Sequence, residues 1–281
     1  MLPATVAHFT QMGLEVGCDD SATTVHAIDM ACCENLYFVF NCFLTLGGIG
    51  YLYKQNLDKT PYGRYVKSLG KQVSVPAKLA WFLQELPSFL VPVLLWYTTD
   101  RRTTKSRILL LVMFCGHYFQ RTFIYALLTR GRPSPLQIVI FAMIFCTING
   151  FFQGYYMVYC AEYDDAWLTD IRLILGGIMF LLGMAINIHS DDILRNLRKP
   201  GEINYKIPRG GMFEYVSGAN FLGEIIEWFG YALATWSLPA LSFAFFTLCS
   251  IGPRAYHHHR YYLEKFEDYP KSRKALIPFV F

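Results

Sequence analysis

The chain has 281 residues, of which 54% are hydrophobic, 17% aromatic and only 16% charged. Soluble globular domains carry about 25% charged residues, so this shortage of charge and the positive mean hydropathy of +0.29 indicate a chain solvated mostly by lipid. The net charge of +4 is small and scattered, which argues against a protein that binds nucleic acid.

Apolar runs predict seven membrane-spanning helices, because a helix of about 20 apolar residues crosses the hydrocarbon core of a bilayer. The breaks between runs are rich in Gly, Pro and charge, as in LDKTPYGR and RGRPSP. We expect the spans at residues 30–53, 76–98, 107–128, 136–160, 172–190, 216–233 and 236–253. This pattern predicts an all-α integral membrane protein with an N-terminal segment (1–29), one membrane domain (30–253) and a C-terminal tail (254–281).

Basic residues predict the orientation, because Lys and Arg concentrate on the cytoplasmic side of membrane proteins. The first 30 residues contain neither, whereas 18 of the 25 basic residues lie in the tail or after the first, third and fifth spans. We therefore expect a lumenal or exterior N-terminus and a cytosolic C-terminus. The loop after the second span opposes this orientation, since it holds Arg101, Arg102, Lys105 and Arg107.

Eight cysteines are present, none of them in a Cys-x-x-Cys pair, and most lie inside apolar runs. Buried cysteine behaves as a small hydrophobic residue, so we interpret these as packing residues and expect no disulfide framework. The first 20 residues lack the basic start and the apolar run of a cleaved signal peptide, so we expect none.

The second span carries polar side chains in the middle of an apolar helix. Gln84 and Glu85 stand side by side, and Pro87 removes a backbone hydrogen bond just after them. An ionisable residue at membrane depth is costly and marks a candidate functional site, with a structural hydrogen bond between helices as the alternative. Desolvation favours the neutral acid form of Glu85, which can donate a hydrogen bond.

Four further spans carry polar side chains on single helix faces. These faces hold Tyr118, Arg121 and Tyr125 in the third span, Asn149 and Gln153 in the fourth, Asn187 and Asp191 at the end of the fifth, and Asn220, Glu224 and Glu227 in the sixth. Polar faces on so many helices predict one internal site more readily than a set of isolated interhelical hydrogen bonds.

The predicted cytosolic segments combine cations with aromatic rings. They include Tyr205, Arg209 and Gly210-Gly211 after the fifth span, and Arg254, His257, His258, His259, Arg260 and Tyr262 in the tail. Such a rim suits an anionic, phosphate-bearing ligand, with contact to anionic lipids as the alternative. Adjacent histidines on a helix cannot all face one ion, and no Cys or carboxylate is suitably spaced, so we expect no metal.

Five stretches of the sequence resemble the steroid 5-alpha-reductase family. They are AWFLQELPSF at 80–89, HYFQRTFIY at 117–125, NIHSDDILRNLRKPGE at 187–202, YKIPRGGMFEYVSGANFLGEIIEWFGYALATWSLPA at 205–240 and RAYHHHRYYLEKFEDYPKSRKALIPFVF at 254–281. The resemblance covers nearly everything from residue 80 onward, and the first 75 residues carry little of it. It implies an NADPH-dependent reduction of the 4,5 double bond of a 3-oxo-Δ4-steroid of the testosterone or progesterone type, in the endoplasmic reticulum membrane of a eukaryote or the inner membrane of a bacterium.

By this resemblance, Glu85 and Tyr118 would hydrogen-bond the C3 carbonyl oxygen of the steroid, with Gln84 helping to position them. Hydride addition at C5 of an enone places negative charge on that oxygen. A neutral acid and a phenol in a dry site stabilise this charge in the transition state. We expect Trp81 and Trp228 to form walls of the steroid cavity.

The cofactor would enter from the cytosol into a membrane-buried site, which agrees with the lack of a Gly-x-Gly-x-x-Gly fingerprint opening a helix. By resemblance, its contacts would be Asn187, Asp191, Arg198, Tyr205, Asn220 and Glu224, with Arg132, Arg254, His258 and Tyr262 near the phosphates and the adenosine end. We expect a monomer whose partners are a steroid and the lipid bilayer, with neither metal nor nucleic acid.

Two alternatives remain open at this point. A related membrane reductase of lipid or polyprenol metabolism would use the same hydride geometry on another enone or enoyl substrate. A seven-span receptor or transporter would use the buried Glu and Asn residues to bind a ligand or an ion. Against the second alternative, no inverted repeat is visible and the basic, aromatic tail favours a nucleotide site.

Overall fold

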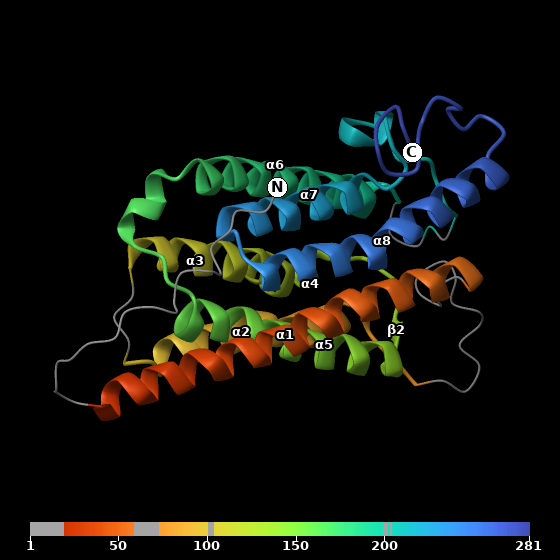
Figure 1. Cartoon of the computed structure of the whole chain (residues 1–281). Helices are drawn as coiled ribbons and strands as arrows, with labels where there is room; N and C mark the ends of the chain where they lie inside the picture. Colours follow the sequence, from red (N-terminus) through yellow and green to blue (C-terminus); the bar gives the residue numbers. More distant parts are fainter. Residues whose placement is uncertain (1–19, 59–72, 101–103, 199–201, 203) are drawn as a thin grey trace.

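The structure is a computed structural model that describes residues 20–58, 73–100, 104–198, 202 and 204–281, and only the backbone of residues 20–34. Within these residues, seven long helices run along one common direction, with the chain reversing between them (Figure 1). They are α1 (Asp20–Leu57), α2 (Ala77–Tyr97), α3 (Lys105–Phe119), α5 (Leu136–Tyr155), α6 (Ile171–Asn196), α7 (Ala219–Thr235) and α8 (Leu238–Lys265).

The remaining elements are short. Two π-helical turns, η2 (Gln120–Tyr125) and η3 (Tyr156–Cys160), continue α3 and α5, and α4 (Ala126–Leu128) follows η2. Two 3₁₀ turns are η4 (Asp165–Thr169) and η5 (Gly211–Glu214). The strands β1 (Ser74–Val75) and β2 (Ser134–Pro135) pair antiparallel, which ties the start of α2 to the start of α5.

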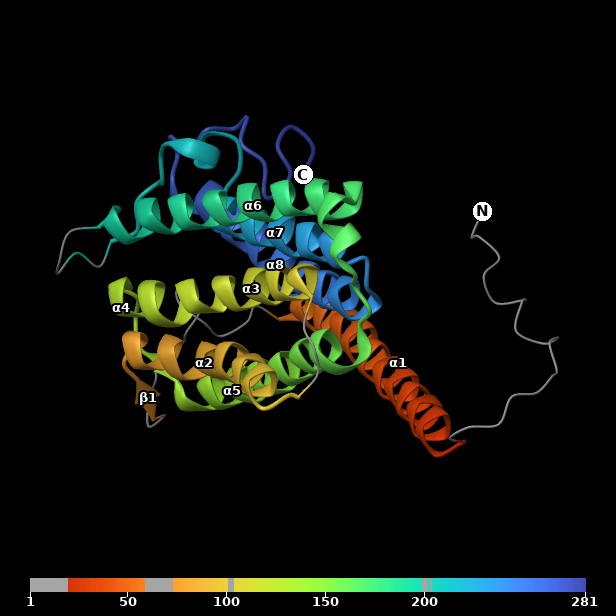
Figure 2. The same cartoon turned by 90° about the vertical axis from the view of Figure 1, so that its left-hand side faces the viewer.

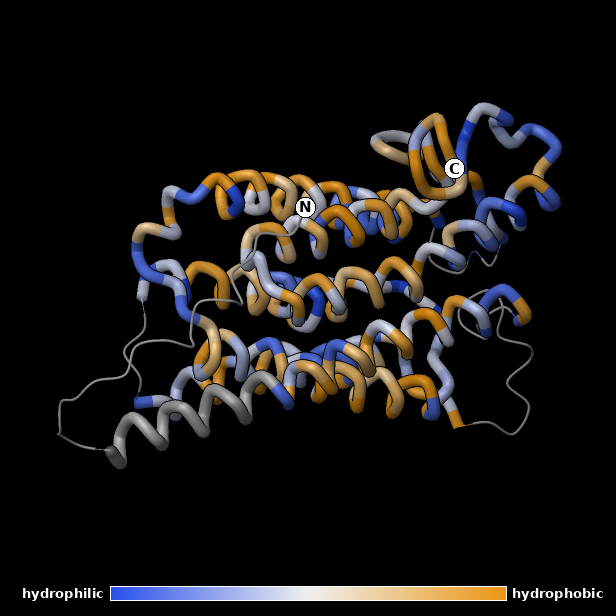
Figure 3. Tube along the Cα trace, viewed as in Figure 1, coloured by the Kyte–Doolittle hydropathy of each residue, from blue (hydrophilic) through white to orange (hydrophobic). Residues whose placement is uncertain are grey.

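Six helical segments of the described chain are long and apolar enough to cross a membrane. They are 35–57, 77–97, 105–128, 136–160, 171–196 and 238–265. The seventh long helix, α7, has 17 residues and packs extensively against α6 and α8. Large apolar side chains face outward, such as Leu181 at 65% exposure, which is favourable only if their surroundings are lipid. The predicted all-α membrane fold is therefore confirmed, and Figure 3 shows apolar segments along the helices.

The two ends of the bundle are built differently. The start of α1 and the segment 161–170 lie at one end, whereas the β1–β2 pair, the segment 204–218 and the C-terminus lie at the other (Figure 1). In Figure 2, α6 and α7 form one side of the bundle and α2 and α5 the opposite side, with α3 between them. The polar faces of α2, α3, α6 and α7 therefore meet in the interior.

Glycines bring α6 and α7 into backbone contact. A Cβ atom on Gly183 of α6 would lie 2.3 Å from the backbone nitrogen of Glu227 on α7. A Cβ on Gly223 of α7 would lie 2.4 Å from the backbone nitrogen of Asn187 on α6. Small residues allow membrane helices to pack this closely, and the contact fixes the register of the polar side chains on the two helices.

The structure differs from the sequence prediction in several places: the predicted span 216–233 is not among the six segments, and α1 begins ten residues before the predicted span at 30. The helix α8 continues to Lys265, twelve residues past the predicted span end at 253, because the polar residues 254–265 extend the helix beyond the apolar run. The interpretation of every cysteine as a packing residue is wrong for Cys160, which is disulfide-bonded at the end of η3. Cys42, Cys115, Cys146 and Cys249 are free, so the partner of Cys160 lies outside the described side chains.

Candidate active site

Glu85 and Tyr118 lie together in the interior of the bundle. Glu85 comes from α2, and its Oε2 lies 4.0 Å from the sulfur of Cys146 on α5. Tyr118 comes from α3 and is 4% exposed, and its hydroxyl oxygen accepts a hydrogen bond of 3.4 Å from the Asn149 amide on α5. Glu85 and Tyr118 are close enough to interact electrostatically. Three helices thus bring the predicted carboxyl and phenol groups to one place, with Gln84 partly exposed next to Glu85.

A π-helical turn follows Tyr118 directly in the sequence. In η2 the backbone N–H of Ala126 bonds to the carbonyl of Arg121, five residues earlier. Such turns are rare in proteins overall, but many of those that occur lie at functional sites. Here the turn carries the buried Arg121, whose guanidinium lies 4.7 Å from the ring centre of Trp81 and 4.1 Å from that of Tyr125. The predicted wall residue Trp81 therefore lies beside a buried cation.

Arg121 also connects the predicted catalytic and cofactor residues. Its Nη1 donates to Oδ2 of Asp191 on α6 at 2.9 Å, and Oδ1 of Asp191 accepts a bond of 3.2 Å from the Asn220 amide on α7. The Asn187 amide donates to the backbone carbonyl of Asn220 at 2.9 Å. Asn187, Asp191 and Asn220, which the sequence only placed on two helix faces, therefore form one network.

Glu224 occupies a central position among these groups. It is partly exposed, although it interacts electrostatically with Glu85, Tyr118, Arg121 and Asp191. A carboxylate with accessible surface among buried polar groups is available to a ligand. Glu224 is thus close to both the Glu85–Tyr118 pair and the Asp191–Asn220 network.

A second group of predicted residues surrounds Tyr205, in the segment after α6. The guanidinium carbon of Arg132 lies 5.7 Å from the centre of the Tyr205 ring, and that of Arg198 lies 5.2 Å from it. The ring of Tyr261 on α8 packs at 5.6 Å in a T-shaped arrangement. Two cations next to one tyrosine ring form a site that is suited to an anion.

The three residues predicted on α8 have separate contacts. Nη2 of Arg254 donates to the Tyr51 hydroxyl on α1 at 3.2 Å, and its buried Nε has no hydrogen-bond partner among the described residues. The His258 ring packs on Phe221 at 5.5 Å. Tyr262 is 3% exposed and stacks on Tyr269 of the tail at 5.3 Å.

The tail that follows α8 folds back onto the segment 204–218. Arg273, whose side chain is fully buried, donates to the backbone carbonyl of Pro208 at 2.8 Å and to Glu214 at 3.2 Å. Ser217 bonds to the Tyr269 hydroxyl at 2.6 Å. A backbone bond from Gly210 and the nearby Arg273 hold the pKa of Glu214 below its usual value. These contacts place the tail beside the loop that carries Tyr205.

Trp228 lies in different surroundings from Trp81. It is 1% exposed, in an aromatic cluster with His117 at 4.5 Å, Phe243 at 4.7 Å and Tyr118 at 5.8 Å between ring centres. Its neighbour Glu227 is fully buried and bonds to Nδ1 of His117 at 2.7 Å. Sequence reasoning gave His117 no role, and only its position beside Tyr118 pointed to it.

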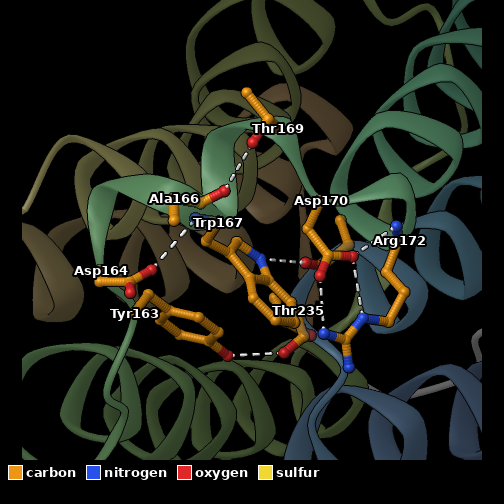
Figure 4. A network of polar contacts seen from close by, with 9 residues as sticks. Tyr163, Asp164, Ala166, Trp167, Thr169, Asp170, Arg172 and Thr235 are labelled. Atoms are coloured by element: carbon orange, nitrogen blue, oxygen red, sulfur yellow. Dashed lines mark hydrogen bonds and ion pairs between the residues drawn. The ribbon is translucent and has the colours of Figure 1, made fainter.

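The opposite end of the bundle is closed by the segment 161–170 (Figure 4). The Tyr163 hydroxyl donates to the Thr235 carbonyl at 2.6 Å, and the Trp167 indole donates to the Ala234 carbonyl at 3.0 Å, both at the end of α7. Burial raises the pKa of Tyr163, so its phenol stays neutral and donates. A 440 Å³ depression lined by Arg107 and Trp167 lies there, away from the Glu85–Tyr118 pair. Among the described residues, no group of His, Cys, Asp and Glu is arranged to hold a metal ion.

The chain is similar to a family of known proteins. The family model described as 3-oxo-5-alpha-steroid 4-dehydrogenase matches residues 132–281. The chain is 61% identical over 239 residues to 3-oxo-5-alpha-steroid 4-dehydrogenase 2 of Sus scrofa and, equally, of Homo sapiens, which covers 84% of this chain and 94% of each relative. It is 51% identical over 226 residues to 3-oxo-5-alpha-steroid 4-dehydrogenase 1 of Bos taurus, covering 79% of this chain and 88% of that relative.

Proposed function

Because the chain belongs to the 3-oxo-5-alpha-steroid 4-dehydrogenase family and is an oxidoreductase, we propose that it uses NADPH to reduce the 4,5 double bond of 3-oxo-Δ4-steroids. Testosterone and progesterone represent the substrate type, and the products are 5α-dihydrosteroids. The observation that carries this proposal is that Glu85 and Tyr118 both lie against the same stretch of α5 in the bundle interior, at Cys146 and Asn149. Membership of an oxidoreductase family also excludes the receptor and transporter alternative.

Glu85 and Tyr118 act on the C3 carbonyl oxygen of the steroid. Both donate a hydrogen bond to that oxygen, on which negative charge develops when a hydride adds at C5 of the enone. Donors held in place in a site without water stabilise such charge far more than donors in water do. Gln84, next to Glu85 on α2, helps to position the pair. Trp81 and Trp228 provide apolar surface around the steroid.

The residues around Tyr205 and on α8 suit a phosphate-bearing nicotinamide cofactor. Arg132 and Arg198 flank one ring, and the buried Nε of Arg254 retains an unused donor among the described contacts. When bound, the cofactor supplies the hydride for C5. Asn187, Asp191, Asn220 and Glu224 hold its nicotinamide end near Glu85, and Arg132, Arg198, Tyr205, Arg254, His258 and Tyr262 hold its phosphates and adenosine end. The tail 254–281 closes this site, and a single chain provides every residue assigned to it.

We also propose a location in the endoplasmic reticulum membrane, or the inner membrane in a bacterium, with a lumenal or exterior N-terminus. The disulfide of Cys160 supports this orientation, because disulfides persist in oxidising compartments and Cys160 ends η3, directly before the segment 161–170 that lies at the same end of the bundle as the start of α1. In microsomes, a glycosylation sequence placed before Met1 gains a glycan, and one placed after Phe281 does not. The reverse pattern contradicts the orientation.

A substrate panel tests the function directly. The purified protein in lipid, supplied with NADPH, is offered testosterone, progesterone, an enoyl-CoA and a polyprenol-type enal, and products are identified by mass spectrometry. We expect 5α-dihydrosteroids and little reduction of the chain-like substrates. Tyr118→Phe serves as the matched control and should slow steroid reduction. Preferential reduction of the enoyl-CoA or the enal would favour a related lipid reductase and contradict the steroid assignment.

A further inference from the structure

We infer that Asn149 positions the catalytic phenol: its amide donates to the Tyr118 hydroxyl oxygen, so that the Tyr118 proton is directed to the substrate carbonyl. The inference rests on the proposed role of Tyr118 and adds a residue on a third helix to the Glu85–Tyr118 pair. Asn149 lies on α5, is 1% exposed, and its Nδ2 lies 3.4 Å from the Tyr118 oxygen. This distance is longer than the usual 2.7–3.2 Å, and catalytic hydrogen bonds in ligand-free enzymes are often long and shorten when substrate binds.

The contact between α5 and α2 holds Asn149 in place. A Cβ atom on the next residue, Gly150, would lie 2.8 Å from Cα of Ser88, so the two helix backbones touch at this level. The Ser88 hydroxyl donates to the backbone carbonyl of Cys146 at 2.8 Å, between the same two helices. Glu85 lies one helical turn before Ser88, so the Asn149 amide and the Glu85 carboxyl group are held by the same helix contact.

The available donors and acceptors determine where each proton lies. A phenol has one proton and accepts up to two hydrogen bonds. The Ser88 proton is committed to the backbone carbonyl of Cys146. The Asn149 NH₂ group can only donate. Asn149 therefore occupies an acceptor position of the phenol oxygen and leaves the Tyr118 proton to be donated to a bound ketone.

The hydrogen bond from Asn149 to Tyr118 should stabilise the transition state as well as orient the phenol. When the Tyr118 proton moves toward the developing enolate oxygen, negative charge grows on the phenol oxygen. An N–H group aimed at that oxygen stabilises it more strongly in the transition state, where the charge grows, than in the ground state. The other atom of the amide, Asn149 Oδ1, is buried without a hydrogen-bond partner among the described residues. An unpaired buried acceptor costs stability, and Oε1 of Gln153 on the same helix is likewise buried without a partner among the described residues.

A double-mutant cycle between Asn149 and Tyr118 tests the inference. Asn149→Leu should lower kcat by roughly 10-fold or more, as expected for a hydrogen bond to a developing charge, while the KM for the steroid and the Kd for NADPH stay within about twofold. In the Tyr118→Phe background the same substitution should have almost no further effect. Asn149→Ser, which keeps a donor, should recover part of the rate.

Gln153→Leu is the matched control. Gln153 is a buried amide four residues further along α5, also 1% exposed, and it donates to the Pro239 carbonyl at 3.0 Å. We expect it to lower thermal stability with kcat nearly unchanged. If Asn149→Leu is as fast as the native protein, or equally damaging with and without the Tyr118 hydroxyl, the inference is wrong while the proposed function stands. If the native protein reduces no steroid, the proposed function fails, and the inference fails with it.

Discussion

The guanidinium of Arg121 lies 2.9 Å from the carboxylate of Asp191, and both side chains are only 8% exposed. This ion pair joins η2 to α6 inside the bundle. On one side Arg121 lies against Trp81 and Tyr125, and on the other Asp191 accepts from Asn220. The pair therefore connects the proposed steroid wall to the proposed cofactor residues, and it leaves neither charge unpaired in the membrane interior.

Substituting one partner of the Arg121–Asp191 pair should destabilise the fold much more than substituting both. Arg121→Gln leaves Asp191 as a buried, unpaired charge, for which we expect a loss of about 3–5 kcal/mol of stability. Adding Asp191→Asn removes that charge and should restore a large part of the loss. Thermal unfolding of the three variants in lipid nanodiscs measures the coupling. Additive losses in the double variant would show that the two residues act independently.

The contact between α6 and α7 should tolerate no added methyl group. A Cβ on Gly183 would lie 2.3 Å from the backbone of Glu227, so Gly183→Ala has to push the helices apart, at a cost of about 1–3 kcal/mol. Gly177→Ala on the same helix is the control, because its Cβ meets nothing within 4 Å and Ala favours helix over Gly by about 1 kcal/mol. Melting temperatures of the two variants should move in opposite directions, and equal shifts would contradict this packing.

Arg198→Ala should weaken cofactor binding selectively. Arg198 lies against Tyr205, and a charge-assisted contact of about 1.5–3 kcal/mol to a phosphate predicts a rise of roughly 10-fold or more in the KM for NADPH. Arg195→Ala is the control, because its guanidinium pairs with Asp192 instead. Steady-state kinetics with each substrate varied separates the effects. A changed steroid KM with an unchanged NADPH KM would place Arg198 outside the cofactor site.

Because of Asp170, the stability of the first turn of α6 should depend on pH under acidic conditions. Its carboxylate accepts from the side chain and the backbone N–H of Arg172 (Figure 4), which lowers its pKa from 3.8 to about 2. A carboxyl group with a depressed folded-state pKa stabilises the fold above its unfolded pKa, and this contribution is lost as pH falls from about 4 to about 2.

The melting temperatures of the native protein and Asp170→Asn should therefore differ at neutral pH and converge near pH 2. Glu162→Gln, at an exposed side chain of the same segment, provides the control. A difference that persists unchanged at pH 2 would show that Asp170 acts through something other than its charge.

The sequence was sufficient to predict the positions of the membrane helices, because their outer faces contact lipid and are therefore apolar. The run 136–160 coincides with α5 and η3, since every turn there is apolar. The end of α8 was missed because hydropathy follows contact with lipid, whereas the helix continues through polar residues to Lys265. Cys160 was misread because a cysteine at the end of an apolar run gives no sign of its redox compartment.

The site was predictable only as separate helix faces. Spacing placed Asn187 with Asp191 and Asn220 with Glu224, but a face does not identify its partner on another helix. Arg121 and Asp191 are 70 residues apart, and their pairing depends on how η2 and α6 lie in the folded bundle. The donation from Asn149 to Tyr118 likewise required the α2–α5 contact at Gly150.

The role of Glu85 is the central claim, and one measurement tests it most directly: the kcat of Glu85→Gln beside its Kd for NADPH, with Cys146→Ala as a control for packing next to Glu85. Gln keeps the size of the side chain but replaces the acid proton with a weaker amide donor. We predict that kcat for steroid reduction falls by roughly 100-fold or more, as found when one donor to a developing oxyanion is lost, and that the Kd for NADPH stays within about twofold. A near-native kcat together with weakened NADPH binding would contradict the account.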